Sequence, residues 1–145
     1  HKAETGYFVK GEGMEVIRSW QERGVTVPKP YERHLKVVLA PDRRNVPEIT
    51  FSFVYVYPQS RTDMHAHDRP ELIIITSGRG KSVCDGREVD IEQDMALWVL
   101  PGERHQVINT GDDMLKLATV FVPAYRAENL LSGIFAAAEA AKGEK

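Results

Sequence analysis

The sequence has only one cysteine, Cys84, in 145 residues, and it has neither a long apolar run nor a marked excess of one charge. A single cysteine excludes an intramolecular disulfide, and with it the small disulfide-stapled scaffolds. The absence of an apolar stretch of about 18 residues argues against a transmembrane helix within this sequence. Because the net charge is -2 and no basic tract occurs, nucleic acids and anionic membrane surfaces are not expected partners.

The chain also lacks a recognisable secretory signal, and it begins with His1 rather than methionine. We therefore expect a cytoplasmic protein, and we leave the imidazole of His1 out of any site. The composition, 42% hydrophobic and 28% charged, is typical of globular domains. One domain over residues 1–145 is expected, because a chain of this length can bury a core and no repeat or linker divides it.

Many short strands separated by turn residues are expected in the middle of the chain. Strict alternation over residues 49–57 predicts a strand with two unlike faces, and the apolar run 72–76 predicts a strand covered on both faces. Asp85-Gly86 lies between two strand-like segments, 81–84 and 87–91, and predicts a hairpin. Further strands are expected at 34–39, 95–100, 104–109 and 114–122. This series favours a sandwich or barrel of antiparallel strands.

Helices are expected at the two ends. From Met14 to Arg23 the apolar residues fall at roughly helical spacing and Gly24 follows, so a short amphipathic helix is predicted there. Residues 25–31 contain two prolines and are expected to form a connector or an edge segment. Residues 129–141 are rich in alanine and leucine at helical spacing and predict a C-terminal helix, packed on the barrel or on a second subunit.

Three histidines and one glutamate form the most informative pattern. His65 and His67 are spaced i, i+2, so in an extended strand both imidazoles point to the same face. Glu71 follows a turn-forming Asp-Arg-Pro, and His105 follows a later Pro-Gly turn. Imidazoles and a carboxylate suit a divalent first-row ion such as Fe, Mn, Ni, Co or Zn. A single histidine is more often an ordinary hydrogen-bonded residue, so the prediction depends on all four occurring together.

The segment from Gln59 to Gly78 resembles the first of the two sequence motifs of the cupin superfamily. The cupin motif has the form G-x5-H-x-H-x3-E-x6-G. His65, His67, Glu71 and Gly78 fill its last four positions in register, while Gln59 stands at the leading glycine.

The second cupin motif has the form G-x5-P-x-G-x2-H-x3-N, and it is matched without a gap at Gly102, His105 and Asn109. Asp94 stands at the first glycine and Leu100 at the proline, with Pro101 one residue late. We interpret the departures as local turn substitutions, since aspartate is among the residues that tolerate left-handed backbone. The resemblance spans about residues 48–122.

The resemblance implies an all-β fold, a small antiparallel jelly-roll barrel of the cupin type. The barrel core would span about residues 34–123, with an N-terminal extension over 1–33 that holds the short helix, and a C-terminal helix over about 125–142. It also implies that His65, His67, Glu71 and His105 hold one divalent transition metal ion. Many cupins use segments outside the motifs for dimer contacts.

Three further residues are candidates for catalysis. Arg69 and Arg104 lie beside ligands in the sequence, and a planar guanidinium suits a substrate carboxylate or phosphate. Tyr57, near the first motif, could move a proton. A solvated surface arginine is an equally good interpretation of either arginine. His34 is interpreted as an ordinary strand residue.

We expect a metal-dependent enzyme acting on a small polar metabolite, with isomerase, lyase or decarboxylase chemistry on a sugar-like or oxo-acid substrate. A cupin dioxygenase and a non-catalytic metabolite-binding module are the alternatives, because the motif residues occur in barrels of many chemistries. A two-fold homodimer is also expected, since the first strand region and the last helix offer more apolar surface than one small barrel covers.

Overall fold

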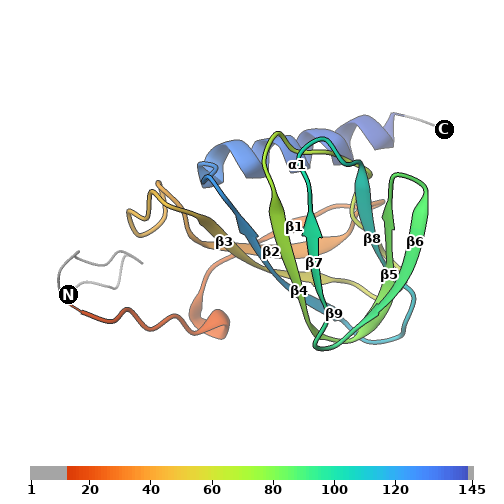
Figure 1. Cartoon of the computed structure of the whole chain (residues 1–145), viewed down its shortest axis with the longest axis horizontal. Coiled ribbons are helices and arrows are strands. Elements are labelled where there is room, and N and C mark those ends of the chain that lie inside the picture. The colour runs from red at the N-terminus through yellow and green to blue at the C-terminus, as the bar shows by residue number, and fades with distance from the viewer. Residues whose placement is uncertain (1–12, 144–145) are drawn as a thin grey trace.

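A computed structural model describes residues 13–143 of the chain (Figure 1). It contains nine strands and one α-helix in the described range. The strands are β1 (Val25–Val27), β2 (Arg33–Leu39), β3 (Thr50–Val56), β4 (Glu71–Ser77), β5 (Arg79–Cys84), β6 (Arg87–Glu92), β7 (Ala96–Val99), β8 (His105–Asn109) and β9 (Leu115–Phe121). The helix is α1 (Ala127–Lys142). No helix in residues 13–143 is long and apolar enough to cross a membrane.

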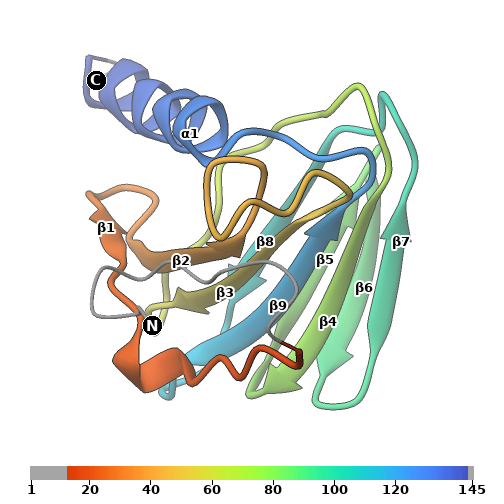
Figure 2. The ribbon, with the colours of Figure 1, turned by 90° about the vertical axis from the view of Figure 1, so that its left-hand side faces the viewer.

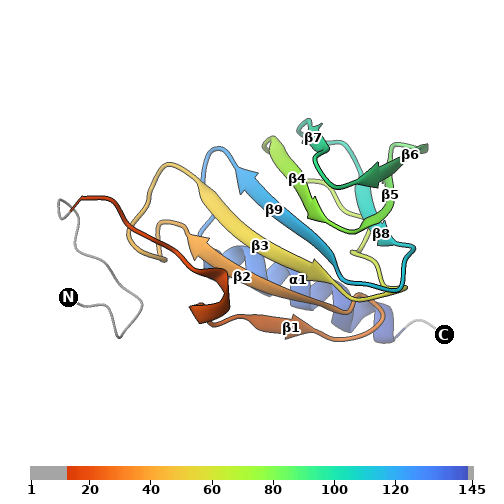
Figure 3. The ribbon, with the colours of Figure 1, turned by 90° about the horizontal axis from the view of Figure 1, so that it is seen from below.

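The strands form two antiparallel sheets. One has six strands in the order β1-β2-β3-β9-β4-β7, and the other has three in the order β6-β5-β8. The two sheets face each other as the layers of a jelly roll, with α1 lying along one side of the pair (Figures 2 and 3). The predicted all-β jelly-roll fold with a C-terminal helix is therefore confirmed.

Strand β3 has small inward-facing side chains, and for this reason a space remains between the two sheets. Its inward residues are small: Thr50, Ser52, Val54 and Val56 are all buried, whereas the aromatic residues between them lie half-buried on the outer face. A wall of hydroxyl and valine side chains leaves room that phenylalanines would occupy. The sequence predicted two unlike faces, and the structure turns the small face inward.

The β5–β6 hairpin has the predicted geometry. Asp85 and Gly86 have φ angles of 47° and 82°, so both lie in the left-handed region that a two-residue hairpin turn requires. The strands pair in register from Arg79 opposite Glu92 to Cys84 opposite Arg87. The turn chemistry and the strand alternation agree here, so this element was predictable from a few residues.

The helix predicted for residues 14–23 is wrong. Only Ser19–Gln21 forms a single 3-10 turn. The side chains of Met14 and Trp20 are 89% and 76% exposed, so this segment has no surface against which to bury an apolar face. A short segment without such packing does not gain enough to hold a helix. Residues 1–12, the first part of the predicted extension, lie outside the described residues.

The segment after this turn behaves as expected. Val25–Val27 forms β1, an edge strand that pairs antiparallel with β2 and ends just before Pro28. A proline is tolerated there because an edge strand leaves one row of backbone donors unused.

Helix α1 begins at Ala127, between the start at residue 129 that the apolar spacing predicts and the start near residue 125 expected from the domain division. The carboxylate of Asp42 accepts hydrogen bonds from the backbone N–H groups of Ala127, at 2.6 Å, and Glu128, at 3.1 Å. These donors have no partner within the helix, so a distant loop supplies the N-terminal cap. Leu130 and Ala138 are buried against the sheets, which confirms packing on the barrel within the same chain.

Two left-handed residues stand at the motif positions where cupins carry glycine. Gln59 has a φ angle of 63° and Asp94 of 74°, so the interpretation of these departures as turn substitutions is confirmed. A residue with a Cβ atom is strained in this region, and glycine is not. The Gln59 amide also donates to the carbonyl oxygens of Gly111, at 2.8 Å, and Thr110, at 3.3 Å.

We therefore expect Asp94→Gly to raise the free energy of unfolding by about 0.5–1 kcal/mol. Gln59→Gly relieves the same strain but removes the two amide hydrogen bonds, so no gain is expected. Urea unfolding of both variants beside the parent protein measures the difference. An Asp94→Gly protein that is less stable than the parent would contradict this account of the turn.

Candidate metal centre

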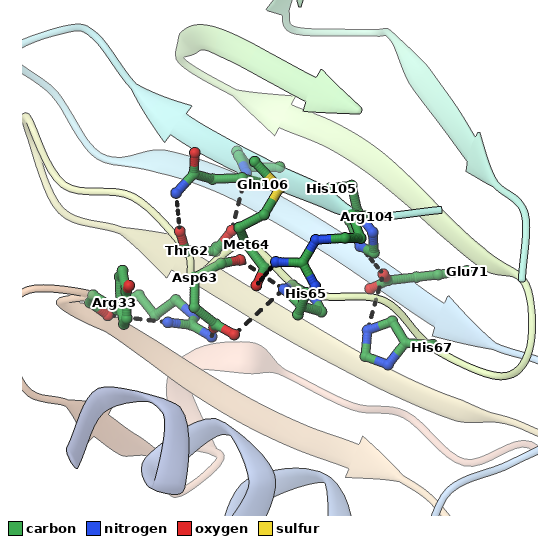
Figure 4. A network of polar contacts seen from close by, with 12 residues as sticks. Arg33, Thr62, Asp63, Met64, His65, His67, Glu71, Arg104, His105 and Gln106 are labelled. Carbon is green, nitrogen blue, oxygen red and sulfur yellow. Dashed lines mark hydrogen bonds and ion pairs between the residues drawn. The ribbon is translucent and has the colours of Figure 1, made fainter. Parts of the chain in front are cut away.

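The four predicted ligands come together in space. One nitrogen of each of His65, His67 and His105 and a carboxylate oxygen of Glu71 all lie within 4.8 Å of one another. Glu71 is the first residue of β4 and His105 the first of β8, while the other two histidines lie on the segment that precedes β4. Figure 4 shows the side chains converging from these three parts of the chain.

Backbone pairing between the segment before β4 and strand β8 brings His65 next to His105. These residues form an isolated antiparallel bridge, with N–H to O distances of 3.1 Å and 2.8 Å in the two directions. A second bridge joins Arg61 to Ile108. Directly opposed residues in an antiparallel pair point to the same face. The register therefore brings together the imidazoles of two residues that lie 40 positions apart in the sequence. Their ring centroids are 4.4 Å apart.

The ring orientations of His65 and His105 are fixed by backbone carbonyls. The Nδ1 atom of His65 lies 2.7 Å from the carbonyl oxygen of Asp63, and that of His105 lies 3.0 Å from the carbonyl oxygen of Glu103. Because a carbonyl only accepts, each Nδ1 carries a proton and donates. When such a ring is neutral, its Nε2 lone pair is left for an ion, as in metal-binding histidines.

His67 and Glu71 complete the group. The Nε2 atom of His67 is buried without a hydrogen-bond partner and lies 3.8 Å from Glu71 Oε1. The same carboxylate oxygen lies 3.1 Å from His105 Nε2. A buried polar atom without a partner is costly, so it calls for a ligand. His67 Nδ1 faces the Tyr125 hydroxyl at 3.5 Å.

Electrostatics keep two of the imidazoles neutral. Burial, together with the neighbouring His65 and His105, lowers the pKa of His67 to about 3. Burial and His105 also lower the pKa of His65. Burial opposes protonation of His105 too, but the hydrogen bonds to Glu71 and to the Glu103 carbonyl, with the charges of Glu71 and Asp63, together outweigh burial and raise its pKa. His65 and His67 are therefore unprotonated near pH 7, as metal ligands must be.

These residues fit a divalent transition metal ion. Three Nε2 atoms and one carboxylate oxygen face a common point, and the unpartnered His67 nitrogen is the observation that a metal would satisfy. This donor set suits first-row ions rather than Ca²⁺ or Mg²⁺, which prefer oxygen ligands. When bound, such an ion supplies Lewis-acid chemistry to a carbonyl or carboxylate oxygen.

A buried ion pair supports the site from behind. Arg33 and Asp63 form a salt bridge at 3.2 Å, and Arg33 is 3% exposed. The second oxygen of the Asp63 carboxylate lies 3.6 Å from His65 Nδ1, beside the carbonyl bond already described (Figure 4). The Arg33 guanidinium also donates to the carbonyl oxygen of Tyr31 at 3.1 Å. Such outer contacts orient a ligand and tune its basicity.

The ligands open into an internal cavity of about 60 Å³. A water needs on the order of 10–15 Å³ by this measure, so the cavity has room for a few water-sized groups. Residues from both sheets and from α1 line it. A wider recess of about 260 Å³ adjoins it between α1 and the segment before β4, and His65, His67, Leu130 and Ile134 line both spaces. The candidate ligands His65 and His67 therefore face both spaces.

The structure does not bring the three predicted catalytic residues into the cavity. Tyr57 follows the last residue of β3 and does not line the cavity. Arg69 stacks on the Tyr125 ring at 3.6 Å, pairs with Asp68 at 2.7 Å and donates to the carbonyl oxygen of Ala124 at 2.6 Å. Arg104 is exposed and its guanidinium lies 3.5 Å from the carbonyl oxygen of Met64. The positions of these three residues give no support to the catalytic roles expected for them, which remain predictions.

Sequence reasoning missed three residues beside the site: Arg33, Asp63 and Tyr125. Asp63 lies two positions before His65. The same i, i+2 spacing that puts the two histidines on one face therefore predicts Asp63 on that face as well. No sequence signal marked Arg33 or Tyr125, because their contacts depend on strand register and on the path of the chain into α1.

A second cluster, Cys84, Asp85 and Glu103, has donor atoms equally close together. Its carboxylates are already used: Asp85 accepts from the Arg104 backbone N–H at 3.1 Å, and Glu103 accepts from that of Leu100 at 2.7 Å. Burial and the neighbouring Glu103 raise the pKa of the Cys84 thiol. A protonated thiol is a poor metal ligand and nucleophile, so this cluster is a weaker donor set than the three histidines and Glu71.

Fold and site together define a cupin barrel with a candidate metal centre. Within that class, the family model for the AraC-like ligand binding domain matches residues 54–141, which is more than half of the chain, and the protein belongs to this family. None of the curated protein sequences compared matches the chain significantly.

Solved structures with the same fold carry several different descriptions. A Thermotoga maritima protein described as a predicted oxalate decarboxylase has a TM-score of 0.69 at 22% identity, covering 75% of this chain and 99% of its own. KdgF from Halomonas sp. has a TM-score of 0.65 at 15% identity, covering 80% and 99%. The polyketide cyclase RemF from Streptomyces resistomycificus has a TM-score of 0.67 at 17% identity, covering 76% and 80%. At these identities the likeness shows the fold and not a reaction.

Proposed function

We propose that the protein is a metal-dependent enzyme that binds and activates a small carbonyl or carboxylate compound by isomerase, lyase or decarboxylase chemistry. The observation that carries the proposal is the unpartnered Nε2 atom of His67, buried in a group of three imidazoles and one carboxylate that opens into a cavity. A site with no chemical role has no need of a buried nitrogen without a partner.

The chain's own residues divide the work at this site. His65, His67, Glu71 and His105 would hold the ion, and Asp63 keeps His65 in the required orientation. Helix α1 and the two sheets surround the cavity with mainly apolar side chains, which strengthens electrostatic interactions with a bound oxyanion. The small cavity limits the part of a substrate that lies between the sheets to a few atoms.

The test begins with protein purified without added metal and analysed for bound ions. It continues with metal-stripped and reloaded protein, screened for turnover of small oxo-acids and sugar acids and for oxygen uptake. Stoichiometric metal with turnover that disappears on stripping is the expected result. Substrate-dependent oxygen uptake would replace the proposal by the dioxygenase alternative. Protein that binds no metal under any loading condition would refute it.

A non-catalytic binding module is the second candidate, because the matched family is described as a ligand binding domain. A module of this kind would bind a metabolite in the cavity and leave it unchanged. Metal-dependent ligand binding without turnover of any bound compound is the outcome that would favour it.

We also propose that the protein is a two-fold homodimer. The outer face of the six-stranded sheet carries two apolar rows across β3, β9, β4 and β7. They are Phe51, Val120, Leu72 and Trp98 in one row and Phe53, Ala118, Ile74 and Ala96 in the next. These rows contain no charged residue, and Trp98 is 58% exposed. A self-complementary apolar face is what a two-fold interface requires. Helix α1 is not needed for this contact, because its apolar residues pack within the chain.

Light scattering at micromolar concentration is expected to give twice the chain mass of 16.4 kDa. Trp98→Glu places a charge in the apolar face and should lower the mass to that of one chain. Trp20→Glu is the matched control, because Trp20 is exposed on the N-terminal segment, outside the two rows. A parent protein that is monomeric at this concentration would contradict the dimer.

A further inference from the structure

The cavity wall beyond the candidate ligands is largely apolar. Its apolar members come from both sheets and from α1, and they include Leu35, Val54, Val107, Leu117, Phe121 and Ile134. A polyhydroxylated ligand would lose its hydrogen bonds to water here and find few replacements. The wall therefore disfavours a sugar-like ligand.

The charged group in this wall beyond the four ligands does not change that conclusion. Arg33 lines the cavity, but its guanidinium is held by Asp63 at 3.2 Å and by the carbonyl oxygen of Tyr31 at 3.1 Å. The positive charge is already compensated within the protein. A second carboxylate on a ligand would have to compete with Asp63 for it.

Ser52 supplies a fully buried polar atom without a partner to this wall. Ser52 is 1% exposed, lines the cavity, and its hydroxyl has no hydrogen bond. It lies opposite Thr119 in the β3–β9 ladder, and Thr119 in turn lies opposite Ile73, two residues after Glu71 on β4. Two strand spacings, about 10 Å across the sheet, therefore separate the Ser52 backbone from the strand that carries Glu71. A ligand held at the metal centre can extend its tail toward this hydroxyl.

We propose that the cavity selects a short oxo-acid with one acidic head and an uncharged, mainly apolar tail. Where the tail carries one polar atom, the hydroxyl of Ser52 forms a hydrogen bond with that atom. The inference rests on the proposed metal-dependent function, because the acidic head is held by the metal centre. The small cavity volume of about 60 Å³ restricts the tail to a few carbon atoms.

The test measures dissociation constants by calorimetry with Zn²⁺-loaded protein, using pyruvate, 2-oxobutyrate and 2-oxovalerate as probes. Each added methylene is expected to lower the dissociation constant about fourfold while the cavity accepts it. 2-Oxoglutarate has the length of 2-oxovalerate but ends in a carboxylate, so it should bind at least about tenfold more weakly. Equal binding of these two acids, or no effect of chain length, would overturn the proposal.

Ser52→Ala separates the polar contact from the apolar wall. Acetopyruvate has the five carbons of 2-oxovalerate with an additional carbonyl on the tail. The variant should lose about fivefold in affinity for acetopyruvate and retain its affinity for 2-oxovalerate. Because it removes a buried hydroxyl that has no partner, its melting temperature should not fall. Equal losses for both acids would overturn the role of Ser52.

The outcomes distinguish this inference from the proposed enzyme activity. Selective binding of apolar-tailed acids without turnover would leave the ligand class standing and refute the activity. Turnover of charged or polyhydroxylated acids with no preference for an apolar tail would do the reverse. Metal-free protein is the binding control, and it should lose the affinity contributed by the acidic head.

Discussion

Replacing His105 by alanine is expected to reduce the affinity for a divalent transition metal by more than about 100-fold. Loss of a partner that only supports a ligand typically costs about 10–100-fold, and His105 is itself a candidate ligand. Its Nε2 atom lies 3.1 Å from Glu71 Oε1, and its ring centroid lies 4.4 Å from that of His65. Removing it leaves an incomplete donor set. Competition with a metal chelator of known affinity measures the change.

Thermal unfolding gives a second measure of the same effect. Metal at about 100 times its dissociation constant stabilises the parent protein by about 2.7 kcal/mol, because it binds the folded chain. The His105→Ala protein should show no such rise in melting temperature at the same metal concentration. His34→Ala is the matched control, because His34 is bonded to Thr26 on the edge of the six-stranded sheet and does not line the cavity. Full metal occupancy in His105→Ala would refute the centre.

Replacing Asp63 by alanine is expected to lower the free energy of unfolding by about 3–5 kcal/mol, because the buried Arg33 guanidinium loses its compensating charge. For a chain of this size that corresponds to a fall in melting temperature on the order of 10 °C. Arg33 is 3% exposed and its bond to Asp63 is 3.2 Å long, so water replaces the carboxylate poorly. Thermal or urea unfolding of metal-free protein makes the measurement.

Two further variants test the cause of this loss. Asp90→Ala removes a carboxylate that is 89% exposed and lies 3.5 Å from Lys81, so a change below about 1 kcal/mol is expected. The double variant Arg33→Met, Asp63→Leu removes both charges and should recover most of the lost stability. A double variant as unstable as Asp63→Ala would show that the cost comes from lost packing rather than from an uncompensated charge.

Asp63→Ala should also weaken the metal centre, but less than His105→Ala does. The Asp63 carbonyl still accepts from His65 Nδ1 at 2.7 Å after the substitution, and only the carboxylate at 3.6 Å is lost. We expect a fall in metal affinity within the 10–100-fold range of outer contacts. The order of the two effects distinguishes a ligand from a residue that orients one.

The sequence by itself determined the elements whose signals lie within a few residues. The Asp85-Gly86 turn, the alternation in β3 and the spacing of His65 and His67 are local, because backbone conformation and side-chain direction depend on immediate neighbours. The same holds for the left-handed positions of Gln59 and Asp94, which the cupin motif spacing located. The set of metal ligands was predictable because the spacing within the cupin motifs reflects which residues the strand register brings together.

Only the tertiary structure decided the contacts between distant segments. Asp42 caps α1 from 85 positions away, and Arg33 meets Asp63 across 30 positions. Neither residue type predicts its partner, since both partners are fixed by how strands pair and where loops return. Packing between distant segments also explains why the helix predicted for residues 14–23 does not form, because its apolar residues have no surface to pack against. It also explains the apolar cavity, because which face of β3 turns inward is settled by packing against the other sheet and α1.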